Sequence, residues 1–116
     1  TDFIVRLLDI LPDGTQYNLT EGILRARFRG SIWGEPKRLE PGKPYEFTIT
    51  LQPTSNFFRK GHRIAVQITS SSFPLWDPNP NTGHPQGRDA ELRPAEQAIF
   101  LGGERASRIE LFVLDR

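Results

Sequence analysis

The chain has 116 residues, with ten glycines, ten prolines and no cysteine, and its 15 basic and 14 acidic residues nearly cancel. This length fits one domain, and the lack of cysteine excludes disulfides and thiol chemistry. A net charge of +1 argues against nucleic acid or an anionic membrane as a partner. No apolar run approaches the roughly 20 residues of a membrane span and no signal peptide is visible. The sequence does not fix the compartment, and we only slightly favour the cytoplasm.

The chain begins directly on a strand-like run without an initiating methionine, and we interpret it as a piece of a longer protein. Apolar and polar residues alternate with a period of two along most of its length, which predicts β-strands. Residues 3–10 are fairly apolar on both faces, as is typical of a strand covered on two sides. Further strands are predicted, in chain order, at residues 23–29, 45–51, 63–69, 97–101 and 108–114.

Turn residues separate these runs, and the one helix-like window, residues 89–97, is interrupted by Pro94. A long polar, proline-rich crossing spans residues 70–94. Short strands joined by turns and long crossings predict an all-β fold, an antiparallel β-sandwich of the jelly-roll (galactose-binding-like) type. We expect residues 1–116 to form this single domain. Tight turns are predicted at Pro12-Asp13-Gly14, Pro41-Gly42 and Gly102-Gly103.

The run after residue 58 contains the residue types of a serine-hydrolase site, namely His62, the serines at 70–72 and Asp77. An α/β-hydrolase nucleophile sits in G-x-S-x-G at a strand-to-helix turn, and the glycine–serine–glycine segment at 30–34 has the wrong spacing. Serines that end a strand commonly bond the backbone instead. We therefore expect no catalytic residue here and interpret His62 as a turn residue that holds a loop.

Oxygen ligands alternate at Asp77, Asn79 and Asn81, as in the first half of a calcium loop. The glycine comes one residue too late, and Arg88 occupies the position of the final glutamate. Zinc is excluded more strongly, because there are two distant histidines and no cysteine. We expect neither a metal nor a cofactor, and assign these side chains to turns.

Arg25, Arg27 and Arg29 recur at every second residue, which places them on one face of a predicted strand. Such a stripe is most simply a solvated face, and the second interpretation is contact with another domain of the same polypeptide. A phosphate or carboxylate-rich partner is a third. Nucleic acid is disfavoured because the net charge is small and no aromatic platform is evident.

Several aromatic residues lie in predicted loops instead of strands. They are either buried loop anchors or an exposed patch for a sugar or a partner domain. The second interpretation gives an alternative function, a carbohydrate-binding or adhesion module. The residues concerned are Trp33, Phe57, Phe58, Phe73 and Trp76.

An ordered set of short motifs runs through nearly the whole chain, from Asp2-Phe3 and Leu8-Asp9-Ile10 to Ala106-Ser107-Arg108. Together these motifs resemble the C-terminal non-catalytic domain of the X-Pro dipeptidyl-peptidase and cocaine esterase family of serine hydrolases. Residues 88–105 match this pattern less clearly. The most specific motifs are Gly61-His62-Arg63, Ser70-Ser71-Ser72-Phe73-Pro74 and Asn79-Pro80-Asn81-Thr82-Gly83.

The resemblance implies an α/β-hydrolase part with a Ser-His-Asp triad, a helical cap, and this β-domain packed against both. The triad would lie in the hydrolase part, so the three motifs are expected to be structural and this chain to have no catalytic activity. The implied partner is the catalytic domain of the same protein, and the implied substrates are esters and amides, including X-Pro peptides. Family members usually have further strands before the start of this chain, so we expect an open sheet edge that could pair with a second copy.

Overall fold

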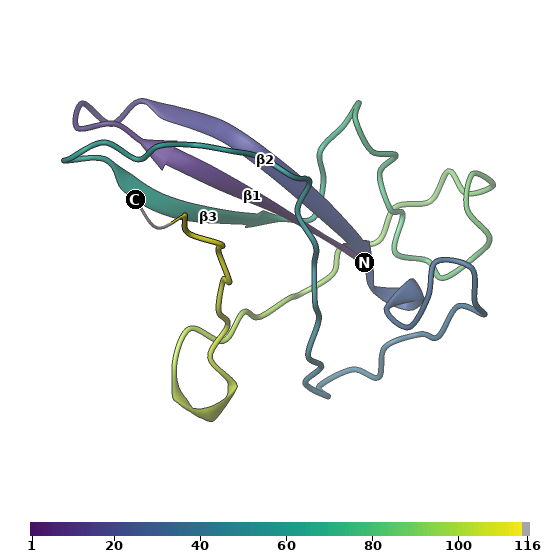
Figure 1. The fold of residues 1–116 in the computed structure, drawn as a ribbon. Helices are drawn as coiled ribbons and strands as arrows, with labels where there is room; N and C mark the ends of the chain where they lie inside the picture. The colour runs from purple at the N-terminus through teal and green to yellow at the C-terminus, as the bar shows by residue number, and fades with distance from the viewer. Residues whose placement is uncertain (115–116) are drawn as a thin grey trace.

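The computed structural model describes residues 1–114. This part of the chain contains one antiparallel sheet and almost no helix (Figure 1). Its strands are β1 (Asp2–Ile10), β2 (Gln16–Arg25) and β3 (Arg63–Thr69), in the order β2-β1-β3. Two 3₁₀ helices, η1 (Ala26–Phe28) and η2 (Gly103–Arg105), are the only helical elements of this part of the chain. The all-β class is confirmed and is consistent with a sandwich, whereas the jelly-roll connectivity stays a prediction.

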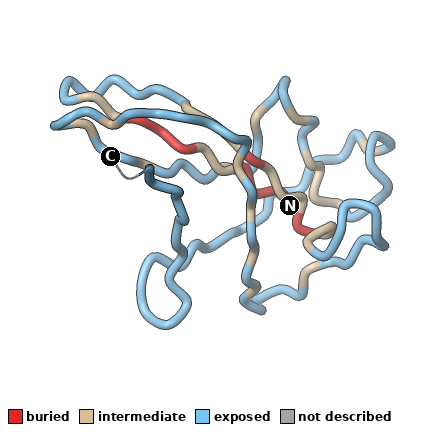
Figure 2. The backbone as a smooth tube through the Cα atoms, in the orientation of Figure 1, coloured by how far each residue is buried: buried red, intermediate tan, exposed pale blue. Residues whose placement is uncertain are grey.

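Strand β1 forms the centre of the sheet because both of its faces are apolar, as the sequence predicted. It pairs antiparallel with β2 on one side and β3 on the other, with Val5 opposite both Gly22 and Ile68. Burial is concentrated along β1 (Figure 2). Removing an aliphatic or aromatic side chain from water contributes about 1.5–3 kcal/mol. The buried apolar residues are Phe3, Ile4, Leu7, Leu8 and Ala26.

The turn between β1 and β2 confirms the prediction made from Pro12-Asp13-Gly14. Leu11 N donates to Thr15 O at 2.9 Å, and Gly14, with φ +89°, donates to Leu11 O. The Asp13 carboxylate accepts from Thr15 N at 2.9 Å, and this hydrogen bond lowers the pKa of Asp13. Glycine is required at position 14 because other residues rarely adopt a positive φ.

Residues 45–51 are extended but do not form the predicted strand. Their side chains still alternate, with Tyr45, Phe47, Ile49 and Leu51 half-buried and the residues between them exposed. The Phe47 ring lies 5.1 Å from that of Phe3. A strand needs a neighbour that satisfies its N–H and C=O groups in a continuous ladder. This segment instead meets the sheet through side chains and, just past its end, through a hydrogen bond from Gln52 N to Glu21 O at 3.2 Å.

Three further strand predictions differ from the structure. The strand expected at 23–29 ends at Arg25, because the chain turns into η1. Residues 97–101 and 108–114 form no strand, and the second of these segments is exposed throughout. The helix-like window at 89–97, which Pro94 interrupts, is irregular. In the segments after residue 69, the alternation is present but no adjacent strand supplies a hydrogen-bonding ladder.

A large open hollow of about 2140 Å³ lies over the sheet face that carries Phe3, Val5 and Leu7. Its walls come from β3 and from the apolar side chains of residues 45–51 and 99–112. Several of these side chains are strongly exposed, including those of Leu101 and Phe112. The hollow is therefore one side of a core that the described residues only partly fill. Within residues 1–114 no helix is long and apolar enough to cross a membrane.

Candidate functional site

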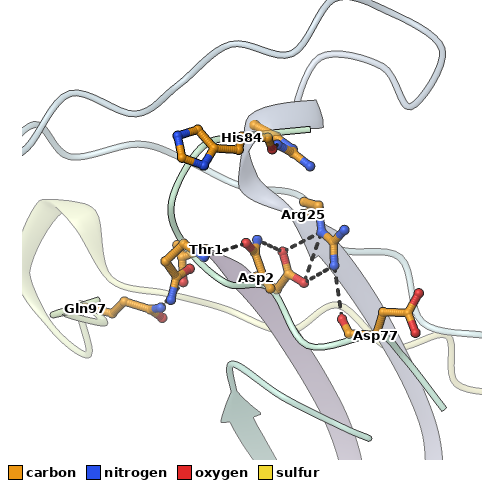
Figure 3. Close-up of polar contacts among 9 residues, drawn as sticks. Thr1, Asp2, Arg25, Asp77, His84 and Gln97 are labelled. Atoms are coloured by element: carbon orange, nitrogen blue, oxygen red, sulfur yellow. Dashed lines mark hydrogen bonds and ion pairs between the residues drawn. The ribbon is translucent and has the colours of Figure 1, made fainter. Parts of the chain in front are cut away.

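The most buried polar contact of the structure joins the start of β1 to the end of β2. Asp2 and Arg25 are paired across the two strands, and their side chains are 2% and 13% exposed. Arg25 Nε donates to Asp2 Oδ1 at 3.0 Å and Arg25 Nη2 donates to Asp2 Oδ2 at 2.9 Å (Figure 3). A bidentate arginine–carboxylate pair of this kind fixes both position and orientation.

This pair holds the loop that follows β3. Asn79 Nδ2 donates to Asp2 Oδ1 at 2.6 Å, and Arg25 Nη2 donates to the main-chain oxygen of Asp77 at 3.1 Å. Figure 3 shows Arg25 between its two partners, the carboxylate of Asp2 and the main-chain oxygen of Asp77. A buried ion pair is tolerated when further hydrogen bonds satisfy its remaining atoms, and Asn79 provides one of them. The asparagine that resembled a calcium ligand therefore contacts a strand carboxylate.

Side-chain hydrogen bonds also hold the rest of the Asn79–Gly83 motif in place. Asn79 Oδ1 accepts from Asn81 N at 3.0 Å, and Asn81 adopts φ +58°, a conformation that asparagine tolerates. Asn81 Nδ2 donates to Arg93 O at 2.9 Å. Thr82 donates to the Asp89 carboxylate, which also lies 2.8 Å from His84 Nδ1. The hydrogen bond from Thr82, followed by that from His84, lowers the pKa of Asp89.

Arginines fasten the same loop from the other side. Arg27 Nη1 donates to His84 O at 2.9 Å, and Arg38 Nη2 donates to Gly83 O at 3.1 Å. Gly83 has φ +79°, and a Cβ there would lie 3.0 Å from the Arg38 guanidinium. Arg29 donates to Lys37 O and lies over the ring of Tyr45. The three arginines of the predicted stripe thus bond within the chain, and their contact with another domain stays a prediction.

A second polar cluster lies on the same sheet face, at the middle of β1. Arg6 Nε donates to Glu21 Oε2 at 2.9 Å, and Arg6 Nη2 donates to Ser72 Oγ at 2.6 Å. The other Glu21 oxygen accepts from Trp76 Nε1 at 3.2 Å. Ser72 therefore anchors its loop to the central strand. Of its neighbours, Ser70 and Ser71 are exposed.

A third cluster lies at the end of β1. His62 Nδ1 is 2.9 Å from Asp9 Oδ1, and Asn56 donates to Asp9 Oδ2 at 3.4 Å. Asp9 is buried and His62 is 16% exposed. Gly61 precedes the histidine with φ +88° and packs against Pro12. His62 holds the entry to β3, which begins at Arg63.

The arrangement offers no assembled nucleophile among residues 1–114. The carboxylate beside His62 is Asp9 and not Asp77, and no serine hydroxyl is bonded to the histidine. The Ser72 hydroxyl is bonded to Arg6. Within the same residues, no group of three or more acidic or histidine side chains is placed to hold a metal ion.

Sequence reasoning selected the loop residues of these clusters and missed their partners on the strands. Asp2, Arg6 and Asp9 lie on β1, and Glu21 lies on β2. The available signal was a charged residue within a strand that is apolar on both faces, because such charges are seldom buried unless they are paired.

Beside Asp2 and Arg25 lies a smaller pocket of about 360 Å³, which we call the end pocket. Its apolar walls come from the end of β2, from η1 and from the loops around residues 32 and 75. Arg25, Asp77 and Gln86 form its polar part. The apolar lining residues are Ile23, Leu24, Phe28, Ile32, Leu75 and Trp76.

The fold and these clusters define a β-domain in which buried charged residues hold long loops against a central strand. Residues 1–110 match the family described as the X-Pro dipeptidyl-peptidase C-terminal non-catalytic domain, and the chain belongs to this family. It is 42% identical over 118 residues to a cocaine esterase of Rhodococcus sp. (strain MB1 Bresler). That match covers 100% of this chain and 20% of the relative, so the chain spans about a fifth of the relative's length. The predicted family is confirmed.

Proposed function

We propose that the chain is the structural, non-catalytic part of a serine hydrolase that acts on ester or amide bonds, including acyl esters or X-Pro peptides. The observation that carries this proposal is the use of the hydrolase-like side chains as anchors. His62 contacts buried Asp9, and Ser72 accepts a hydrogen bond from Arg6. The substrate class follows from the family and from the relative named a cocaine esterase.

The role of the domain is to present fixed loops and an apolar surface to the rest of the protein and to help close its active-site cleft. Its partner is a catalytic α/β-hydrolase domain of the same polypeptide. Support comes from the family's description as non-catalytic and from the exposed apolar walls of the large hollow. Exposed apolar surfaces of this kind mark interaction sites. Residues 1–116 act as a single unit in this proposal.

The hollow itself is best filled by further strands of the parent protein. Segments 45–51 and 108–114 keep the alternation of strands but have no ladder partner in the described chain. Strands added beside them would satisfy their backbone groups and bury their apolar side chains. A second copy that pairs with an open edge is the competing arrangement.

The test of the non-catalytic role uses hydrolysis of a chromogenic acyl ester and of an X-Pro chromogenic peptide. We expect the purified chain to show no turnover above buffer. The Ser71→Ala, Ser72→Ala and His62→Ala variants of the whole parent protein should retain turnover per folded molecule. The proposal would be overturned if the isolated chain hydrolysed either substrate and the same substitution, made in the isolated chain, abolished that hydrolysis.

A further inference from the structure

The end pocket is bordered by large apolar side chains that water reaches. Ile32 is 71% exposed and Leu75 is 62% exposed, although both line the pocket. Trp33, which follows Ile32, is 91% exposed, and Phe73, two residues before Leu75, is 71% exposed, although neither lines the pocket. Exposed apolar residues gathered at a pocket are typical of an interface.

The walls of the end pocket are fixed in position before any partner binds. Trp76 donates through Nε1 to Glu21 and through its main-chain nitrogen to Ser72 O. The main chain at Asp77 is held by Arg25, which is itself held by Asp2 (Figure 3). A preformed site loses little conformational entropy on binding, so even a small contact contributes to affinity.

The lip of the end pocket carries one carboxylate that is not neutralised. Asp77 uses its main-chain oxygen to accept from Arg25, and its carboxylate has no hydrogen bond or ion pair with residues 1–114. Figure 3 shows this carboxylate turned away from Arg25. Arg25 also lines the pocket, but its charge is paired with Asp2, so the Asp77 carboxylate is the unpaired charge of the lining. Such a pocket is complementary to an apolar side chain that lies next to a lysine or arginine.

We propose that the end pocket is the socket into which the catalytic part of the same polypeptide inserts an apolar side chain adjacent to a lysine or arginine. This inference rests on the proposed function. The curated relative is about five times as long as this chain, so a large partner is available within one polypeptide. A pocket of about 360 Å³ takes only one or two side chains. A stable interface between separate proteins buries roughly 1,200–2,000 Å², so a tethered partner fits better than a second copy.

Photo-crosslinking in the whole parent protein tests this directly. A benzophenone amino acid replaces Ile32 or Leu75, one at a time, and crosslinked peptides are identified by mass spectrometry. We expect crosslinks to peptides outside residues 1–116, next to a lysine or arginine. Leu92, which is 73% exposed and lies outside the pocket, is the matched control position and should give no crosslink to those peptides.

A mixture of isotopically light and heavy protein separates contacts within one polypeptide from contacts between two copies. Mixed-label crosslinks would overturn the proposal in favour of a dimer interface. Crosslinks confined to residues 1–116, or identical patterns from positions 75 and 92, would overturn it as well.

Hydrogen exchange provides a second readout that does not depend on the crosslinker. Leu75→Asp in the parent protein should speed exchange in the partner peptide by about tenfold, whereas Leu92→Asp should leave it unchanged. Unchanged exchange with Leu75→Asp would contradict docking. Activity of the isolated chain tests the proposed function separately, so an inactive chain without crosslinks rejects only the docking proposal.

Discussion

Asp2 and Arg25 lie directly opposite each other at the ends of β1 and β2, and the guanidinium binds both carboxylate oxygens. The same two residues fix Asp77 and Asn79 of the loop after β3. One cross-strand pair therefore joins the sheet, the loop and one wall of the end pocket. Disturbing it should affect all three at once.

The first prediction concerns this pair. Asp2→Asn leaves the buried Arg25 charge without a counter-ion, and we expect it to lower the free energy of unfolding by about 3–5 kcal/mol. Urea denaturation of the purified chain measures this change. Glu40→Gln is the control, because its pair with Lys43 is exposed and should contribute less than about 1 kcal/mol. Equal effects of the two substitutions would contradict the assignment.

The second prediction concerns Gly22, where the chain of residues 45–51 approaches β2. A Cβ at position 22 would lie 2.3 Å from the Thr50 main-chain oxygen, so Gly22→Ala must displace that backbone. We expect a destabilisation of about 1–3 kcal/mol, which is typical of overpacking. Thermal unfolding and the chemical shifts of residues 45–51 report the change.

Gly30→Ala is the matched control, because a Cβ there meets nothing within 4 Å. It should be neutral or stabilise by about 0.4–1 kcal/mol through the unfolded state. If Gly22→Ala behaved like this control, the close approach of residues 45–51 to β2 would be wrong.

The sequence predicted the sheet well where a strand has at least one hydrogen-bonded neighbour within the chain. Residues 3–10 and 63–69 became β1 and β3 because the ladder partners are present. Residues 45–51 and 108–114 show equally good alternation and form no strand. Alternation reports which side chains seek burial, but a strand also requires a neighbour that satisfies its backbone groups.

For the candidate site, the sequence indicated the loop residues but not the strand residues to which they bond. The motif residues His62, Ser72 and Asn79 were selected from the sequence as structural, and each bonds to β1 through a partner that lies far away in the sequence. Pairing Asp2 with Asn79 depends on which strands are adjacent, and no local pattern encodes that. Strand β2 ends at residue 25, where Arg25 pairs with Asp2.

The third prediction separates an anchoring role of His62 from a catalytic one. His62→Ala leaves buried Asp9 with only the long contact to Asn56 at 3.4 Å. We expect a loss of about 1–3 kcal/mol in the free energy of unfolding, as for a buried group that loses its partner. Turnover of the parent protein per folded molecule should stay unchanged. A loss of turnover without a loss of stability would show that His62 takes part in the chemistry.

The fourth prediction is the pH dependence of the Asp89 contacts. Because the hydrogen bonds from Thr82 and His84 lower the pKa of Asp89 below its ordinary value of 3.8, they favour the folded state with the carboxylate ionised. Their stabilisation is present above the unfolded-state pKa and is lost as the pH falls through the lower folded-state pKa. Carbon-13 NMR titration of the Asp89 carboxyl measures this pKa. Thr82→Val removes the hydroxyl that donates to Asp89 and should raise the pKa of Asp89 toward 3.8.

The control for this titration is Asp13, whose pKa is lowered mainly by the main-chain N–H of Thr15. Thr82→Val should leave the pKa of Asp13 unchanged, because the two carboxylates lie in separate turns. A common shift of both carboxyl groups would indicate a general change in the fold instead of the loss of one hydrogen bond. An unshifted Asp89 in the variant would show that Thr82 does not hold the Asn79–Gly83 motif to Asp89. The motif would then rely on its contacts with Asp2, Arg38 and Arg93.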